Sequence, residues 1–334
     1  MPVRLLIAFL LLALAGPAPE TGQTPLGHDP LCEASAAVVA PWAPGLVVVA
    51  DNEYAAKLFV FKVEGGTLVG QTPMKVPGKQ RPKDVESLVV AGEQLVLVGS
   101  QSRSATCAAK PERQRIAFYR WNEPEARLRL DRAIDGSPAI AAAGRNPEGC
   151  LRALFTSPPP PLAREFCEAF AAAEAAAGKP NVPCATLNVE GAVAIPSGQG
   201  GAPRIWLGLR SPLTEGNAVL LRLVPSLGEF RFDGVAMLDL GGRGVRELAL
   251  HDGALWGIAG PLEDAADGFA LWRVPMTDVQ PGLKGAAVSF VRDLPASAEG
   301  LVFAGGQWIV VFDVDRQGIG GACQALQLPL GTPN

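Results

Sequence analysis

Short apolar runs separated by turn residues occupy most of this chain. Val, Leu, Phe and Trp dominate the runs, while Gly and Pro gather between them. Clear examples are residues 46–51, 95–100, 205–210 and 308–313. Runs of this length and composition favour β-strands over helices, so the pattern predicts an all-β protein.

One polar pattern recurs ahead of these runs. It consists of a polar residue, any residue, a Glu or other polar residue, and then an apolar run, as in Asp84-Val85-Glu86-Ser87-Leu88. The third position, here called the slot, is occupied in turn by Glu33, Glu86, Ser137, Glu190, Arg246 and Glu299, at intervals of 53, 51, 53, 56 and 53 residues. A constant period of this size is typical of propellers and solenoids.

Further apolar runs follow each slot and supply a four-stranded blade. Six units of this length fill the chain from Gly16 to Asn334, which predicts a six-bladed β-propeller. The last unit lacks a fourth strand, and residues 21–31 lie where one is needed. We expect this N-terminal strand to complete the last blade and close the ring, which removes two exposed sheet edges.

The third unit departs from the pattern. Its second strand is expected at residues 151–157, and four prolines follow. Residues 162–177 are rich in Ala and Glu and predict a helix that ends before Gly178 and Pro180. We therefore expect a helical insertion at about residues 158–183 in blade three.

The first residues are predicted to be a signal peptide. Arg4 precedes an apolar stretch at residues 5–14, and Ala13-Leu14-Ala15 fits a small-residue cleavage site. The alternative is a buried N-terminal helix. We expect a signal peptide at residues 1–15, a single propeller domain at residues 16–334, and a periplasmic or secreted protein. No later segment is apolar enough to span a membrane.

Six cysteines in an exported chain predict disulfides. If the N-terminal strand closes the last blade, Cys32 and Cys323 become neighbours. Cys167 and Cys184 could then hold the helix, which leaves Cys107 with Cys150. Other pairings remain open, because six cysteines allow fifteen connectivities.

Charge excludes one class of partner. The net charge is −4, and no block of Lys and Arg occurs. Nucleic acid binding requires a concentrated basic surface, so we expect none. We expect the mature protein to be a monomer with a small molecule or a protein as its ligand.

The slot residues are the candidates for chemistry, because the first strand of each blade lines the channel of a propeller. Together with the ends of the second strands they predict an acidic arc of Glu299, Asp313, Glu33, Asp51 and Glu86. Carboxylate oxygens are typical calcium ligands. Arg210 and Arg246, beside Glu190, could bind an anion through their guanidinium groups. The alternatives are that each Glu caps backbone amides of the next blade, and that the arginines pair with Glu190 and Glu247.

Several segments resemble the domain-of-unknown-function family 3616. The resemblance rests on five stretches: Asp84–Ser87, Asn188–Gly191, Gly208–Pro212, Gly241–Leu248 and Ala298–Leu301. It implies a propeller-like fold and no particular reaction. The Glu-Gly-Leu slots are more distantly similar to the phytase-like and esterase-like propellers, in which acidic residues of the upper face hold calcium.

Two functions follow as hypotheses. The first is an exported scaffold that binds a ligand or partner at the upper mouth of the channel. The second is a calcium-dependent phosphoester or ester hydrolase, with the acidic arc as the metal site and the two arginines as the anion site.

Overall fold

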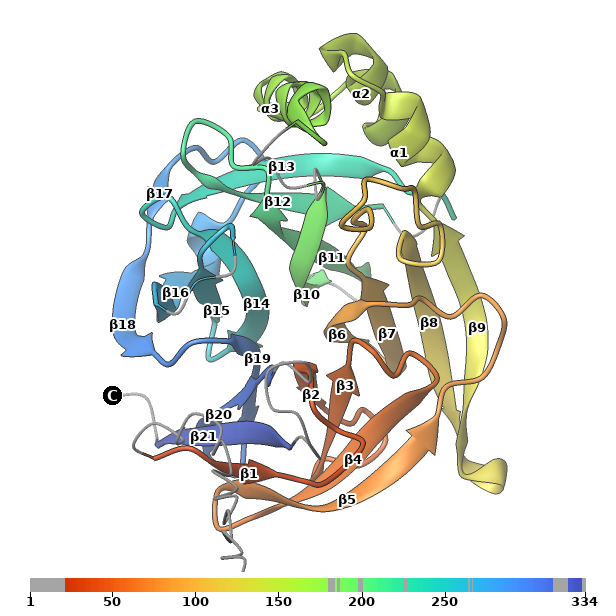
Figure 1. Ribbon diagram of the computed structural model, residues 1–334, viewed down its shortest axis with the longest axis vertical. Helices are drawn as coiled ribbons and strands as arrows, with labels where there is room; N and C mark the ends of the chain where they lie inside the picture. Colours follow the sequence, from red (N-terminus) through yellow and green to blue (C-terminus); the bar gives the residue numbers. More distant parts are fainter. Residues whose placement is uncertain are drawn as a thin grey trace, which may run out of the picture.

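Five sheets surround a central channel in the computed structural model of the chain (Figure 1). The structure describes residues 22–179, 184, 187–197, 201–224, 228–263, 265, 267–314 and 324–331. The innermost strands β2, β6, β10, β14 and β19 contact one another in that order, and β19 contacts β2 again. The all-β propeller predicted from the sequence is therefore confirmed.

The blades follow one another along the chain. Blade one contains β2 (Ala34–Val39), β3 (Leu46–Asp51), β4 (Lys57–Glu64) and β5 (Thr67–Lys75). Blade two contains β6 (Val85–Ala91), β7 (Gln94–Gly99), β8 (Arg115–Asn122) and β9 (Arg127–Asp135). Blade three contains β10 (Asn188–Ser197), β11 (Gly201–Ser211), β12 (Ala218–Leu223), β13 (Phe232–Asp239) and the short β17 (Ala286–Ala287). Blade four contains β14 (Gly244–His251), β15 (Ala254–Gly260), β16 (Phe269–Pro275) and β18 (Ser289–Leu294). Blade five contains β19 (Ala298–Ala304), β20 (Gln307–Phe312), β21 (Ala325–Gly331) and β1 (Thr24–Leu26).

The predicted number of six blades is wrong, because the described part of the third unit, residues 137–179, forms helices instead of a sheet. Within the described residues, three helices lie between β9 and β10: α1 (Ser137–Ala143), α2 (Pro147–Leu154) and α3 (Ala163–Ala176). The predicted helix at residues 162–177 corresponds to α3, but the strand expected at residues 151–157 overlaps α2. Ser137, the supposed slot of blade three, begins α1 outside the ring.

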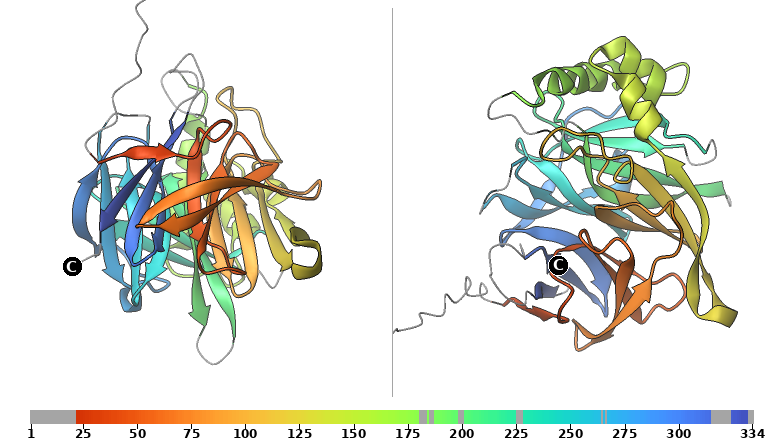
Figure 2. Two further views of the ribbon diagram at one scale, coloured as in Figure 1. Left: turned by 90° about the horizontal axis from the view of Figure 1, so that it is seen from below. Right: turned by 45° about the vertical axis from the view of Figure 1, so that its right-hand side comes forward.

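Local sequence explains why α2 forms. The side chain of Asn146 caps the helix by accepting a hydrogen bond from the Gly149 amide at 2.7 Å, and Pro147 occupies the first turn. The helices lie against the outer side of blade three, beside β13 (Figure 1 and Figure 2). Phe155 and Phe166 join Phe232 of β13 in one apolar cluster. None of the helices in the described ranges has the length and apolar character that a membrane crossing requires.

Two disulfides hold this helical unit, in a connectivity different from the predicted one. Cys150 of α2 bonds to Cys167 of α3, and Cys107 bonds to Cys184. The predicted Cys167–Cys184 and Cys107–Cys150 pairs are therefore wrong, since α2 and α3 pack side by side. By the chain-entropy model, closing loops of 17 and 77 residues contributes up to about 3 and about 4.5 kcal/mol. The predicted Cys32–Cys323 bond involves Cys323, which lies outside the described residues.

The ends of the ring are joined as predicted. Strand β1 pairs antiparallel with β21, with Thr24 opposite Gln327. Gln327 is buried, and its side chain bonds both the amide and the carbonyl of Leu68 in blade one, at 2.8 and 3.0 Å. Its amide group also donates to the carbonyl of Pro25. Blade five is thus tied both to its own closing strand and to blade one.

Candidate functional site

A β-bulge at the start of every innermost strand defines the upper mouth of the channel. In each blade one residue of the first strand lacks a partner on the second, and these residues are Ser35, Glu86, Glu190, Arg246 and Glu299. A bulge redirects a side chain out of the regular alternation of a strand. The slot predicted from the repeat therefore corresponds to the bulge in four blades.

Blade one departs from the prediction. Its bulge residue is Ser35, whose hydroxyl donates to the carbonyl of Val85 at 2.5 Å. Glu33, the predicted slot residue, lies two positions earlier and forms an isolated bridge with Asp313 of blade five. Glu33 and Asp313 thus lie side by side where blades one and five meet.

Arg246 is the centre of the upper mouth. Its Nη1 lies 2.8 Å from Oε2 of Glu190 and 3.0 Å from Oε1 of Glu299, while Nη2 donates to the carbonyl of Pro261. The arginine side chain is only 4% exposed. Blades three, four and five are therefore linked across the mouth by one guanidinium group.

Arg210 supports the same cluster from the second strand of blade three. Its Nη1 lies 3.1 Å from Oε1 of Glu190, and its Nε donates to the carbonyl of Pro261. Glu190 thus receives both arginines. The ion pairing of Arg210 with Glu190, which the sequence left as an alternative to anion binding, is present.

Two carboxyl groups of the mouth, those of Glu86 and Glu299, have raised pKa values. Burial raises the pKa of Glu86 well above its usual range, and the charges of Asp84, Glu190, Glu299 and Asp313 raise it further. Burial also raises the pKa of Glu299 to about 8, with contributions from Glu190 and Asp313, although Arg246 opposes the shift. In both carboxyl groups the raised pKa favours the protonated form.

Asp51 has an architectural role. Its Oδ2 accepts from the amides of Cys32 and Glu33, and its Oδ1 accepts from the amides of Glu53 and Tyr54. Four backbone hydrogen bonds occupy both oxygens of this buried carboxyl group. Asp51 therefore fixes the backbone around the start of β2 and the end of β3. More generally, the described residues contain no group of three or more His, Cys, Asp or Glu side chains that could hold a metal ion.

Glu247 was considered from the sequence only as an ion-pair partner of the arginines, and its contact across the channel was not predicted. Glu247, the neighbour of Arg246, is 1% exposed and accepts a hydrogen bond at 3.0 Å from the hydroxyl of Ser87. This bond joins blades two and four, which are not neighbours, so it crosses the channel. Gly191 makes room for it, because a Cβ there would lie 3.0 Å from the backbone of Glu247. A charged pair, Arg246-Glu247, inside an apolar strand was the available signal.

A charged cleft of about 440 Å³, here called the upper cleft, lies between blades one and two. Asp84 and Arg113 line it and form an ion pair at 3.2 Å. Lys110 and Arg81 add positive charge, and Tyr54 contributes a ring. Because Asp84 acts on the pKa of Glu86, the upper cleft adjoins the mouth.

The opposite end of the channel is apolar. A cavity of about 500 Å³ is lined there by residues of all five innermost strands, including Val38, Val90 and Leu250. His251 lines it as well and stacks on Phe303 with ring centroids 3.6 Å apart. The two ends of the channel therefore differ sharply in polarity.

Comparison with known proteins assigns no reaction to this chain. The WD40 repeats of RRP9 are 11% identical to this chain, with 94% of this chain and 99% of that chain covered and a TM-score of 0.40. Regucalcin from Agrobacterium tumefaciens, described as a calcium-binding protein, is 10% identical, with 93% of this chain and 95% of that chain covered and a TM-score of 0.40. A GH43 β-1,3-galactosidase with galactodeoxynojirimycin is 12% identical, with 91% of this chain and 94% of that chain covered and a TM-score of 0.44. At these TM-scores, all below 0.5, the likenesses carry no argument. A search of curated proteins finds no significant match.

The family resemblance noted in the sequence is confirmed over part of the chain. The match to the model described as "Protein of unknown function (DUF3616)" covers residues 181–289. This range contains β10–β16, and with them Glu190, Arg210 and Arg246. Over that range the chain is similar to the family of unknown function DUF3616.

Proposed function

We propose that the protein is an exported scaffold that binds, at the upper mouth of its channel, a small ligand carrying positive charge. The two disulfides support export, because such bonds persist mainly in oxidising compartments. The bulged residues Glu86, Glu190, Arg246 and Glu299 support the location, because they bring charges from four blades to one opening.

The surroundings of Glu86 carry this proposal. The largest charge effects on its pKa come from four other carboxyl groups. Arg246 lies close enough for Glu86 to raise its pKa, but it is paired with Glu190 and Glu299. Buried carboxylates in such numbers need a cation or protons to balance them. A ligand with an ammonium or other cationic group would displace the protons and supply that balance.

The upper cleft suggests how the rest of the ligand is held. Arg113 and Lys110 could receive a carboxylate or phosphate group, while the cationic end faces Glu86. A zwitterionic molecule therefore fits the charge distribution best. The metal-dependent hydrolase inferred as an alternative gains no support from the grouping of acidic residues in the described ranges.

The test is a thermal-shift titration with two probes, L-lysine and calcium chloride, at pH 5.5 and pH 8.5. Binding to the folded state raises the melting temperature. We expect at least one probe to stabilise the protein more at pH 8.5, because protons compete for Glu86 and Glu299 at lower pH. Glu86→Gln should abolish the shift.

Glu93→Gln is the matched control. Glu93 belongs to the same blade, but its side chain is 91% exposed and forms only a surface ion pair with Arg120. This variant should respond like the wild type. If neither probe shifts the melting temperature, or if Glu86→Gln responds as strongly as Glu93→Gln, the proposal fails.

A further inference from the structure

The apolar cavity at the lower end of the channel, here called the lower cavity, is separate from the charged upper mouth. Its volume of about 500 Å³ lies within the range of about 300–1,000 Å³ that is typical of small-molecule sites. All five innermost strands contribute to its wall. The hydrogen bond from Ser87 to Glu247 crosses the channel at the upper end of the cavity, because the next residues, Leu88 and Leu248, line it.

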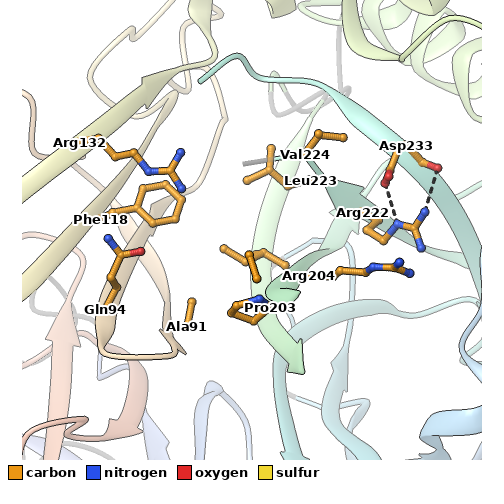
Figure 3. A pocket seen from close by; sticks show the side chains of 12 residues that line it. Ala91, Gln94, Phe118, Arg132, Pro203, Arg204, Arg222, Leu223, Val224 and Asp233 are labelled. Carbon is orange, nitrogen blue, oxygen red and sulfur yellow. Dashed lines mark hydrogen bonds and ion pairs between the residues drawn. The ribbon is translucent and has the colours of Figure 1, made fainter. Parts of the chain in front are cut away.

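The lower cavity lacks the ion pairs that two other hollows contain. The hollow between blades two and three contains Arg222 and Asp233, with Nε and Oδ1 2.6 Å apart (Figure 3). The upper cleft contains the pair of Arg113 with Asp84. The described residues that line the lower cavity include no Asp, Glu, Lys or Arg. A charged ligand would lose its hydration there without gaining a partner of opposite charge, so the lining favours an uncharged one.

An aromatic wall forms one side of the lower cavity. The ring of His251 stacks on Phe303 with centroids 3.6 Å apart and planes 23° apart, and it meets Trp308 edge-on at 5.6 Å. All three residues line the cavity. The carboxylate of Asp252 already lies beside this imidazole, with Oδ2 3.4 Å from Nε2. Aromatic side chains in this arrangement favour a flat ring as their neighbour.

The apolar surface of the lower cavity is recessed, which suits a small molecule better than a protein partner. Within the described part of the chain, the exposed large hydrophobic side chains are Leu262, Phe290 and Val291, and none of them lines the cavity. A protein interface is usually marked by an exposed apolar patch. Pro41 and Pro44, in the turn between β2 and β3, border the cavity and restrict its backbone, so this part of the wall is preformed.

We propose that the lower cavity binds an uncharged, mainly apolar small molecule with a flat ring system. The ring lies against His251 and Phe303. The rest of the molecule packs against Val38 of β2, Val90 of β6 and Leu250 of β14. Removing the apolar surfaces of the ligand and the cavity from water drives binding. This site is independent of the cation site proposed at the upper mouth.

A fluorescence titration with N-phenyl-1-naphthylamine, an uncharged probe that becomes bright in apolar surroundings, tests the proposal. We expect saturable binding of a single probe to each chain. Uncharged 2-methoxynaphthalene should displace the probe, whereas 2-naphthoate, which has the same rings and a negative charge, should require a concentration at least about tenfold higher. Phe303→Leu removes the aromatic ring but keeps an apolar side chain, and it should weaken probe binding about two- to tenfold.

Val90→Asp places a charge in the cavity and should weaken probe binding at least about tenfold. Val291→Asp is the matched control, because Val291 is 43% exposed on β18 and does not line the cavity. This variant should bind the probe like the wild type. Ala194→Phe fills part of the cavity from β10 without adding charge and should also weaken binding. Melting temperatures identify the variants that are folded.

Three results would overturn the proposal. The first is that the probe does not bind, or that 2-naphthoate displaces it as readily as 2-methoxynaphthalene does. The second is that folded Val90→Asp or Ala194→Phe binds the probe as tightly as Val291→Asp. The third is that sedimentation velocity shows a dimer which Val90→Asp converts to a monomer, because a second copy of the chain would then cover this end of the channel.

Discussion

Replacing Arg246 with methionine should destabilise the propeller strongly and in a pH-dependent way. Methionine keeps much of the length and apolar volume of arginine but removes its charge. The change leaves Glu190 with Arg210 as its arginine partner, beside the hydrogen bond from Asn188, and removes the 3.0 Å contact of Glu299. Both carboxyl groups remain buried, with side chains 6% and 12% exposed.

The magnitude follows from these contacts. At an effective dielectric constant of about 20, the 2.8 Å contact between Arg246 and Glu190 is attractive by about 6 kcal/mol before desolvation is subtracted. Removing one partner of a buried ion pair costs about 3–5 kcal/mol net, because the other charge stays buried. Arg246→Lys should lose less, since one ammonium group can still pair with Glu190.

The dependence on pH has a definite sign. Arg246 lowers the pKa of Glu299 in the folded state, so without Arg246 this pKa rises further, while that of the unfolded chain does not change. The folded variant then binds more protons than the unfolded chain at neutral pH, so its stability falls as the pH rises. The loss relative to the wild type should therefore be smaller near pH 5 than near pH 9.

Urea unfolding of the wild type, Arg246→Met and Arg246→Lys at pH 5, 7 and 9 measures these losses. The free energy of unfolding at each pH comes from linear extrapolation, provided that the slopes agree among variants. A loss below about 1 kcal/mol at every pH, the size of a surface pair, would refute the reasoning. So would a large loss that is the same at pH 5 and pH 9.

Two further predictions concern the same channel. The pKa of Glu299 in the folded state, about 8, exceeds its ordinary value of 4.5, so the stability that Glu299 contributes is present below about pH 4.5 and is lost as the pH rises to about 8. Glu299→Gln should therefore make the free energy of unfolding, measured with urea, fall less steeply over this range. An unchanged dependence of that free energy on pH would contradict the prediction. Gly191→Ala should cost about 1–3 kcal/mol, because its Cβ would lie 2.7 Å from Cγ1 of Val245. Gly45→Ala is the control, because a Cβ at Gly45 meets no atom within 4 Å and should change the stability by less than about 0.5 kcal/mol in the same assay. Equal losses in both variants would contradict the predicted clash between the Cβ at position 191 and Val245.

The sequence predicted the blades well and their number badly, for one physical reason. Residues 137–176 form helices, yet this segment is about as long as a blade and contains apolar runs. A short apolar run cannot be assigned to a strand or a helix by periodicity alone. Asn146 followed by Pro147 was the available helix signal, since that pair caps α2.

The candidate site was predicted in part. The repeat located Glu86, Glu190, Arg246 and Glu299, because a bulge needs the same local spacing in each blade. It misplaced blade one, where Ser35 occupies the bulge. The pairing of Arg246 with two glutamates depends on how neighbouring blades face each other, which spacing along the chain does not encode.

The disulfides show the same limit of sequence reasoning. The partner of Cys167 is Cys150 because α2 packs on α3, and these two helices were not both expected. Connectivity follows from which elements meet in space, and the count of cysteines carries no such information.

The pairing of β1 with β21 sets the order in which the molecule can mature. Thr24 and Gln327 are about three hundred residues apart in the sequence. The fifth blade can therefore be completed only after nearly all of the chain has been synthesised. Contacts between such distant positions are slow to form, because a very long loop must close first. The first four blades can assemble earlier, while the N-terminal strand waits for its partner and its unpaired backbone is open to association with other chains.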